Sequence, residues 1–336
     1  MSETEILNKP LAQIEKEQPV VGDFLKSYGL EISDESFCQL VAGLPDEFWE
    51  SSLVTSRELE GQFVDFMKGM ETAMATQKID KLEVLPGNDK NGNPERCNLS
   101  MRPGEITCIV GPTGSGKSRL LADIEWMANA DTPTKRKVLL NGVLPDEEMK
   151  QNFGGKLIAQ ITQNMNFVLD MDVESFLLLH AQSRFLEKSD EKVSEVIELA
   201  NELSGEIFSP QTPVTFLSGG QSRALMIADV ACIGQAPVVL IDEIENAGVD
   251  KKKALELLIS QEKIVLMATH DPLLILQADR RVVIKNGGMQ DIIVTTAQEK
   301  DFYSELEAMD ARMQKARNFF RLGNSIQYVH DRDLLL

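Results

Sequence analysis

Apolar residues in the first part of the chain recur three and four positions apart, the spacing that places them on one face of a helix. The clearest run is Leu59, Phe63, Phe66, Met67 and Met70. Earlier in the chain, Ser33-Asp34-Glu35 offers side chains that can cap a helix start. The pattern predicts a helical domain over residues 1–75, whose apolar face packs into its own core in preference to forming a groove for a partner.

After residue 77, short apolar runs that suit buried strands alternate with helical stretches. The strands are expected at 79–85, 105–110, 137–142, 156–161, 237–241 and 263–268, and the helices at 119–124, 172–204, 222–231 and 254–259. Such alternation is typical of an α/β domain with a parallel sheet. We assign residues 76–295 to this domain, with a helical subdomain at about 165–235, and residues 296–336 to a C-terminal helical extension.

The length of 336 residues leaves room for two domains. The sequence has no run of about 18 apolar residues, the length that spans a bilayer, and its first residues are polar. We therefore expect a cytoplasmic protein, or one held at the inner face of a membrane by a partner. The net charge of −19 argues against nucleic acid or anionic lipid as a partner. Two basic triplets, 135–137 and 251–253, are interpreted as solvated faces.

Candidate chemistry begins with residues 111–118, Gly-Pro-Thr-Gly-Ser-Gly-Lys-Ser, between a predicted strand and a predicted helix. Glycines at this point let successive N–H groups and the helix N-terminus surround one anion. Lys117 adds a charge for the terminal phosphates, and the Ser118 hydroxyl suits Mg²⁺. The segment is a phosphate loop. The predicted ATP contacts here are Gly111, Pro112, Thr113, Gly114, Ser115, Gly116, Lys117, Ser118 and Arg119.

Two acidic residues, Asp242 and Glu243, follow the predicted strand 237–241. Ligands of open α/β sheets bind at the carboxyl ends of the strands, where this pair is expected. Downstream of a complete phosphate loop, Asp242 is expected to hold Mg²⁺ through water. Glu243 is expected to orient and deprotonate the water that attacks the γ-phosphate.

Between these motifs lies Leu217-Ser218-Gly219-Gly220-Gln221, at the start of a predicted helix. The pentapeptide resembles the signature of the ATP-binding cassette superfamily, and the resemblance extends over roughly residues 78–293. It implies a P-loop NTPase fold of that type, with a mixed sheet and a helical subdomain. It also implies a head-to-tail dimer, in which Ser218, Gly219, Gly220 and Gln221 contact the ATP bound by the phosphate loop of a second subunit. With one cassette per chain, the second subunit is another copy or a paralogue, and a homodimer is expected.

Two further residues resemble family elements. Gln163, with Gln160 as the fallback, corresponds to a glutamine that reaches Mg²⁺ and the attacking water, and His270 to a histidine that contacts the γ-phosphate. There are also departures. No aromatic residue for stacking on adenine occurs in 79–85, and the loop 244–250 is one residue longer than usual, which makes Asp250 a tentative counterpart of the family's interface aspartate.

The resemblance implies an ATP hydrolase that binds Mg-ATP and closes and opens as a dimer. Two hypotheses for the coupled work stay open. The first is a soluble mechanochemical ATPase that acts on a protein client through the N-terminal domain and the C-terminal extension. The alternative is the ATP-hydrolysing subunit of a membrane transporter, whose permease contacts the loop 163–172. Chromosome-maintenance and translation ATPases fit poorly, because the chain has neither long coiled-coil insertions nor a second cassette.

Overall fold

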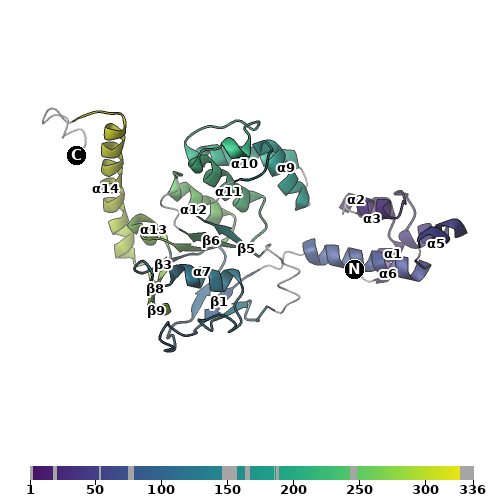
Figure 1. Ribbon diagram of the computed structural model, residues 1–336, viewed down its shortest axis with the longest axis horizontal. Helices are drawn as coiled ribbons and strands as arrows, with labels where there is room; N and C mark the ends of the chain where they lie inside the picture. Colours follow the sequence, from purple (N-terminus) through teal and green to yellow (C-terminus); the bar gives the residue numbers. More distant parts are fainter. Residues whose placement is uncertain are drawn as a thin grey trace. The chain divides into compact units, whose positions relative to one another are not determined.

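A computed structural model describes residues 3–17, 21–52, 54–74, 79–145, 157–162, 167–184, 186, 189–242 and 248–325. The chain forms two compact units, Met1–Gln77 and Lys78–Leu336. Their elements are labelled in Figure 1.

The first unit is helical and has its own core. Its helices are α1 (Glu3–Asn8), α2 (Leu11–Glu17), α3 (Val21–Ser27), α4 (Phe37–Ala42), α5 (Asp46–Ser52) and α6 (Ser56–Met74). Leu59, Phe63 and Met67 of α6 are buried in this core, and the Phe63 ring stacks on that of Phe37 with centroids 3.8 Å apart. The predicted apolar face therefore packs within its own unit.

The cap of α4 lies one residue beyond the predicted segment. The Ser36 side chain accepts a hydrogen bond from the backbone N–H of Gln39. The Gln39 side chain in turn accepts the backbone N–H of Ser36. This reciprocal pair satisfies two backbone donors at the helix start.

The second unit is built on a six-stranded sheet of order β5-β6-β7-β3-β8-β9. Its strands are β3 (Ile106–Val110), β5 (Ile158–Ile161), β6 (Val238–Asp242), β7 (Ile264–Ala268), β8 (Arg280–Lys285) and β9 (Gly288–Val294). The first five run parallel and β9 pairs antiparallel with β8, so the sheet is mixed. This confirms the expected fold class.

Both faces of the sheet are buried, which explains why its strands are continuous apolar runs. In β7, Val265 and Met267 face the core formed with α9 (Val173–Ser183), α10 (Ser189–Ser204), α11 (Gly219–Cys232) and α12 (Lys251–Ser260). Ile264 and Leu266 face the opposite core, to which α7 (Lys117–Glu125) contributes. The described part of this unit also has two short helical segments: α13 (Pro272–Gln277), which the sequence pattern did not predict, and a 3₁₀ turn at Val214–Phe216.

A second, antiparallel sheet was also not anticipated. Its order is β2 (Leu99–Met101), β1 (Leu82–Leu85), β4 (Lys137–Leu140), and its apolar side chains share the core of α7. Each strand has only three or four residues, too few to reveal pairing partners by pattern. The helix α14 (Ala297–Arg321) follows β9, the last strand of the chain, and no other described helix comes after that strand.

Candidate functional site

The phosphate loop connects the end of β3 to the start of α7, at the carboxyl edge of the parallel strands. A cavity of about 570 Å³ lies over it. Eight of the nine predicted contacts from 111–119 line this cavity, all except the buried Ser115, together with Asp242 and His270. Residues far apart in the sequence are thus brought to one hollow, as their order along the strands predicts.

The turn between β8 and β9 packs directly against the phosphate loop. Gly287 donates its N–H to the Ser115 carbonyl at 2.6 Å. Gly116 has a φ of +108°, and a Cβ on it would lie 2.9 Å from the Gly287 Cα. Gly111 faces the Ile284 carbonyl so closely that a Cβ would overlap it. The glycines are therefore required by this chain's own packing.

Two lysine side chains donate hydrogen bonds to backbone carbonyls of the phosphate loop. Lys117 Nζ donates to the carbonyls of Gly111 at 2.9 Å and Pro112 at 3.3 Å. Lys90 Nζ, which the sequence patterns did not single out, donates to the Gly114 carbonyl at 2.9 Å. Lys90 comes from the loop between β1 and β2, so the antiparallel sheet takes part in shaping the phosphate site.

Ser118 and Asp242 lie side by side across the floor of the cavity, with the Ser118 Oγ 3.5 Å from the Asp242 Oδ2. A hydroxyl and a carboxylate are the hard oxygen ligands that Mg²⁺ accepts. The donor set therefore fits the metal. The exposed His270 follows β7 at the same edge.

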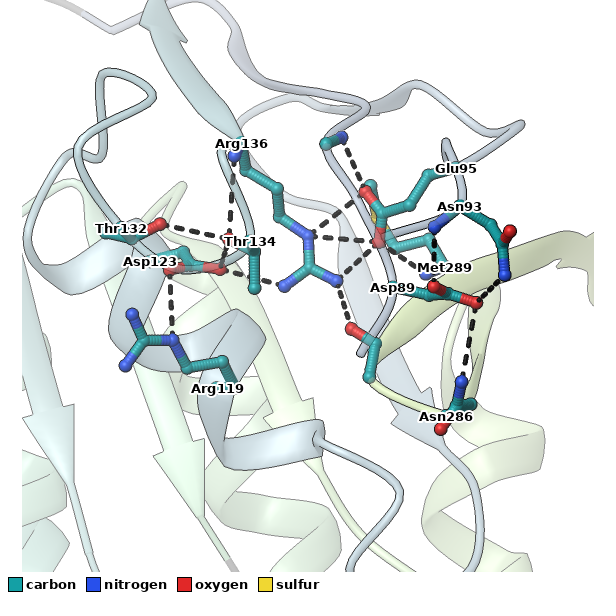
Figure 2. A network of polar contacts seen from close by, with 12 residues as sticks. Asp89, Asn93, Glu95, Arg119, Asp123, Thr132, Thr134, Arg136, Asn286 and Met289 are labelled. Atoms are coloured by element: carbon teal, nitrogen blue, oxygen red, sulfur yellow. Dashed lines mark hydrogen bonds and ion pairs between the residues drawn. The ribbon is translucent and has the colours of Figure 1, made fainter. Parts of the chain in front are cut away.

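A buried cluster of charges supports the site, and Figure 2 shows it centred on Arg136. The Arg136 side chain, fully buried, donates to both Glu95 oxygens, to Asp123 of α7 at 2.8 Å and to the Gly287 carbonyl at 2.8 Å. Glu95 also accepts the Met289 N–H at 2.6 Å. One guanidinium thus connects the strand β4, the helix α7 and the turn that closes the phosphate loop.

This arrangement corrects the interpretation of residues 135–137 as a solvated basic face. Arg136 is fully buried, and its neighbours Lys135 and Lys137 are exposed. In the second basic triplet, Lys251 pairs with Asp271 at 2.6 Å. No signal in the linear sequence separates the central arginine from its neighbours, because its acidic partners Glu95 and Asp123 lie 41 and 13 residues away.

The signature segment forms the N-terminus of α11. Ser218 accepts the Gln221 N–H at 3.3 Å, and the Gln221 side chain accepts the Ser218 N–H at 2.9 Å. Leu217 anchors the turn in the core. None of Ser218–Gln221 lines the cavity over the phosphate loop.

Two predicted site residues, Gln163 and Glu243, lie outside the described residues. The fallback Gln160 is half-buried in β5, paired in register with Leu240 of β6. Asp250 caps α12 by accepting the Lys253 N–H at 3.1 Å.

The strand-loop-helix cradle, with an acidic residue at the end of a neighbouring parallel strand, defines a P-loop nucleotide-binding protein. Within that class, the ABC transporter family model matches residues 95–246. An uncharacterised ABC transporter ATP-binding protein of Methanocaldococcus jannaschii is 50% identical over 252 residues, which cover 75% of this chain and 96% of that protein. The chain belongs to the ATP-binding cassette (ABC) family.

More distant similarities agree. An energy-coupling factor transporter ATP-binding protein of Clostridium perfringens is 26% identical, over 63% of this chain and 75% of that protein. The solved structure of cbiO1 from the same organism, part of an ABC transporter complex, shares the fold with a TM-score of 0.50, 23% identity, and coverage of 72% of this chain and 97% of that one.

Family membership makes the chain an ATP-binding protein and an ATP hydrolase. A quarter of the chain has no counterpart in the Methanocaldococcus relative. Among the described residues, no helix is long and apolar enough to cross a membrane.

Proposed function

We propose that the chain is the ATP-hydrolysing subunit of a membrane transporter, working as a head-to-tail dimer with Mg-ATP. This reverses the order of the two hypotheses drawn from the sequence, where the soluble mechanochemical ATPase came first. The similar proteins named above are described as ABC transporter ATP-binding proteins or as parts of such transporters.

The observation that carries the proposal is a pair of exposed apolar side chains in the segment where the sequence predicts a permease contact. Val168 is 90% exposed and Leu169 is 42% exposed, directly after Phe167, whose ring packs edge-to-face on that of Phe176 with centroids 5.1 Å apart. Apolar residues exposed together in this way mark a surface for a protein partner. We assign this surface to a helix of the permease, at the inner face of the membrane.

In the proposed catalytic cycle, the phosphate loop and Lys117 bind the phosphates, and their N–H groups and charge stabilise the charge that develops during transfer. Ser118, Asp242 and Gln163 would hold Mg²⁺, which neutralises phosphate charge when bound. Glu243 orients and deprotonates the attacking water, and His270 contacts the γ-phosphate. None of Ser218–Gln221 lines the cavity over the phosphate loop of its own subunit. We therefore assign these residues to the ATP site of a second subunit.

Two variants test the catalytic part of the proposal. Lys117→Ala should lose ATP affinity by at least about 100-fold, and undiminished affinity would contradict the phosphate-loop assignment. Glu243→Gln should bind ATP, remain dimeric and stop turning over. Hydrolysis at the wild-type rate would remove Glu243 from its role.

A third experiment tests the permease assignment. The Glu243→Gln protein, loaded with ATP, is purified from membrane and soluble fractions, with and without Val168→Asp and Leu169→Asp. A membrane permease should copurify and be lost on the double substitution. The matched control is Val143→Asp, which alters another exposed apolar residue of the same unit. A soluble enzyme as the sole partner would favour the mechanochemical hypothesis instead.

A further inference from the structure

The helix α14 contacts its own unit along one face only. Tyr303 accepts a hydrogen bond from the Gln277 side chain at 2.9 Å, Arg281 pairs with Glu299 at 2.6 Å, and Lys252 lies 3.7 Å from Glu307. These contacts all fall in the first half of the helix. No residue of its 25 is buried, which is unusual because most helices in proteins depend on packing for their stability.

A different face of α14 carries an apolar stripe. The residues of the stripe are Phe302, Leu306, Met309, Met313, Ala316 and Phe320. Their spacing alternates between four and three, the repeat that forms the seam of a coiled coil. Four of them, Phe302, Met309, Met313 and Phe320, are between 49% and 64% exposed. At 100° per residue, the stripe lies about 100–120° around the helix from the face that carries Tyr303 and Glu307.

Charges along α14 are divided between its two halves. The first half, 297–311, carries five acidic residues and one lysine: Glu299, Asp301, Glu305, Glu307, Asp310 and Lys300. The second half, 312–321, carries four basic residues and no acidic one: Arg312, Lys315, Arg317 and Arg321. A parallel partner of the same sequence would place like charges together. An antiparallel one would place each half beside its opposite.

We propose that α14 pairs antiparallel with α14 of a second copy of this chain. In the register that uses the whole stripe, Phe302 lies opposite Phe320 of the partner subunit. Leu306 then lies opposite Ala316 of the partner subunit, and Met309 opposite Met313 of the partner subunit. The arrangement is self-complementary and closes by a two-fold axis, so it forms a dimer and not a chain of molecules.

The α14 pair needs no nucleotide. It is therefore independent of the ATP-dependent contact under "Proposed function" and would keep two cassettes together after hydrolysis separates their sites. A tether of this kind raises the effective concentration of one cassette near the other, which favours closing again when new ATP binds.

The first test is the sedimentation of the full chain without nucleotide in a low-salt buffer. The wild-type chain should sediment as a dimer, and Met309→Glu with Met313→Glu should sediment as a monomer at the same concentration. Ala311→Glu with Asn318→Glu is the matched control, because it adds the same two charges to exposed positions off the stripe. A monomeric wild type, or a dimer that survives the Met309 and Met313 changes, would overturn the proposal.

The second test fixes the orientation. A chain with Met309→Cys mixed with a chain with Met313→Cys should give a disulfide-linked dimer under mild oxidation, and neither chain alone should exceed the background of the native cysteines. Crosslinking of each variant to itself would show a parallel pair and contradict the charge argument. ATP affinity of the phosphate loop within one subunit is a separate readout, so failure here leaves the catalytic proposal to its own tests.

Discussion

The phosphate loop before α7 and the signature segment before α11 are both rich in glycine. They differ in which neighbouring atoms require the glycines. Around the phosphate loop, Gly111 and Gly116 are forced by contacts within the chain, to Ile284 and Gly287. In the signature segment, a Cβ on Gly219 would meet only the tip of Arg223 at 3.9 Å, with an ordinary φ. No described residue of this chain requires glycine at position 219.

The difference indicates that one cradle is complete within the subunit and the other is shaped for a ligand held elsewhere. The phosphate loop accepts one hydrogen bond from the turn after β8 and another from the Lys90 side chain. The signature turn satisfies its own backbone through Ser218 and Gln221 and leaves Gly219 exposed. Substitutions in the phosphate loop should therefore affect the loop's own structure and ATP binding. Substitutions in the signature segment should affect the ATP site shared between two subunits.

The largest effect on ATP binding is expected from Gly116→Ala. The new Cβ would lie 2.9 Å from the Gly287 backbone, at a φ of +108° that alanine rarely adopts. ATP affinity, measured by titration, should fall by at least about 100-fold because the loop must deform. Gly104→Ala is the control, since Gly104 also has a positive φ but open space around it. If both variants bind ATP like the wild type, the loop is not fixed by the turn.

The buried cluster comes next, because it fixes the turn that closes the phosphate loop. Arg136→Met leaves Glu95 buried without its cation and Asp123 with only the more distant Arg119 at 3.5 Å, and should lower the free energy of unfolding by about 3–5 kcal/mol. Denaturant unfolding measures it. Lys137→Met, at the adjacent exposed position, should change stability by less than about 0.5 kcal/mol. Equal effects of the two substitutions would remove Arg136 from this supporting role.

Arg136 also shows where prediction from the sequence ends. The phosphate loop, the strand before Asp242 and the signature helix start are local patterns, and the sequence alone located all three. Arg136 and Lys90 act through partners that only folding brings near. The antiparallel sheet was missed for the same reason, since its three short strands come from separate stretches of the chain.

Gly219→Ala should have the opposite profile to Gly116→Ala. The free energy of unfolding should stay equal or rise by up to about 1 kcal/mol, because alanine restricts the unfolded chain and nothing crowds its Cβ. ATP hydrolysis should fall at least about tenfold, or about 1.4 kcal/mol in the barrier, if the surface faces the ATP of a second subunit.

The matched control is Gly61→Ala in α6, which has open space in a helix of the other unit. It should stabilise in the same way and leave turnover unchanged. Full turnover in Gly219→Ala would contradict the distinction between the two cradles.

At neutral pH the smallest of these effects concerns the far end of the signature helix. Lys263, before β7, donates to the Gly234 carbonyl at 2.7 Å, just beyond α11, and burial lowers the pKa of Lys263 to about 8. Between pH 8 and 10.5 the unfolded chain holds this proton and the folded chain releases it. Stability should therefore gain from this group as pH rises through that window.

Denaturant unfolding at several pH values checks this contribution. The stability of the wild type minus that of Lys263→Met should rise between pH 8 and 10.5. A flat difference for Lys263 would mean that its ammonium is hydrated in the folded chain.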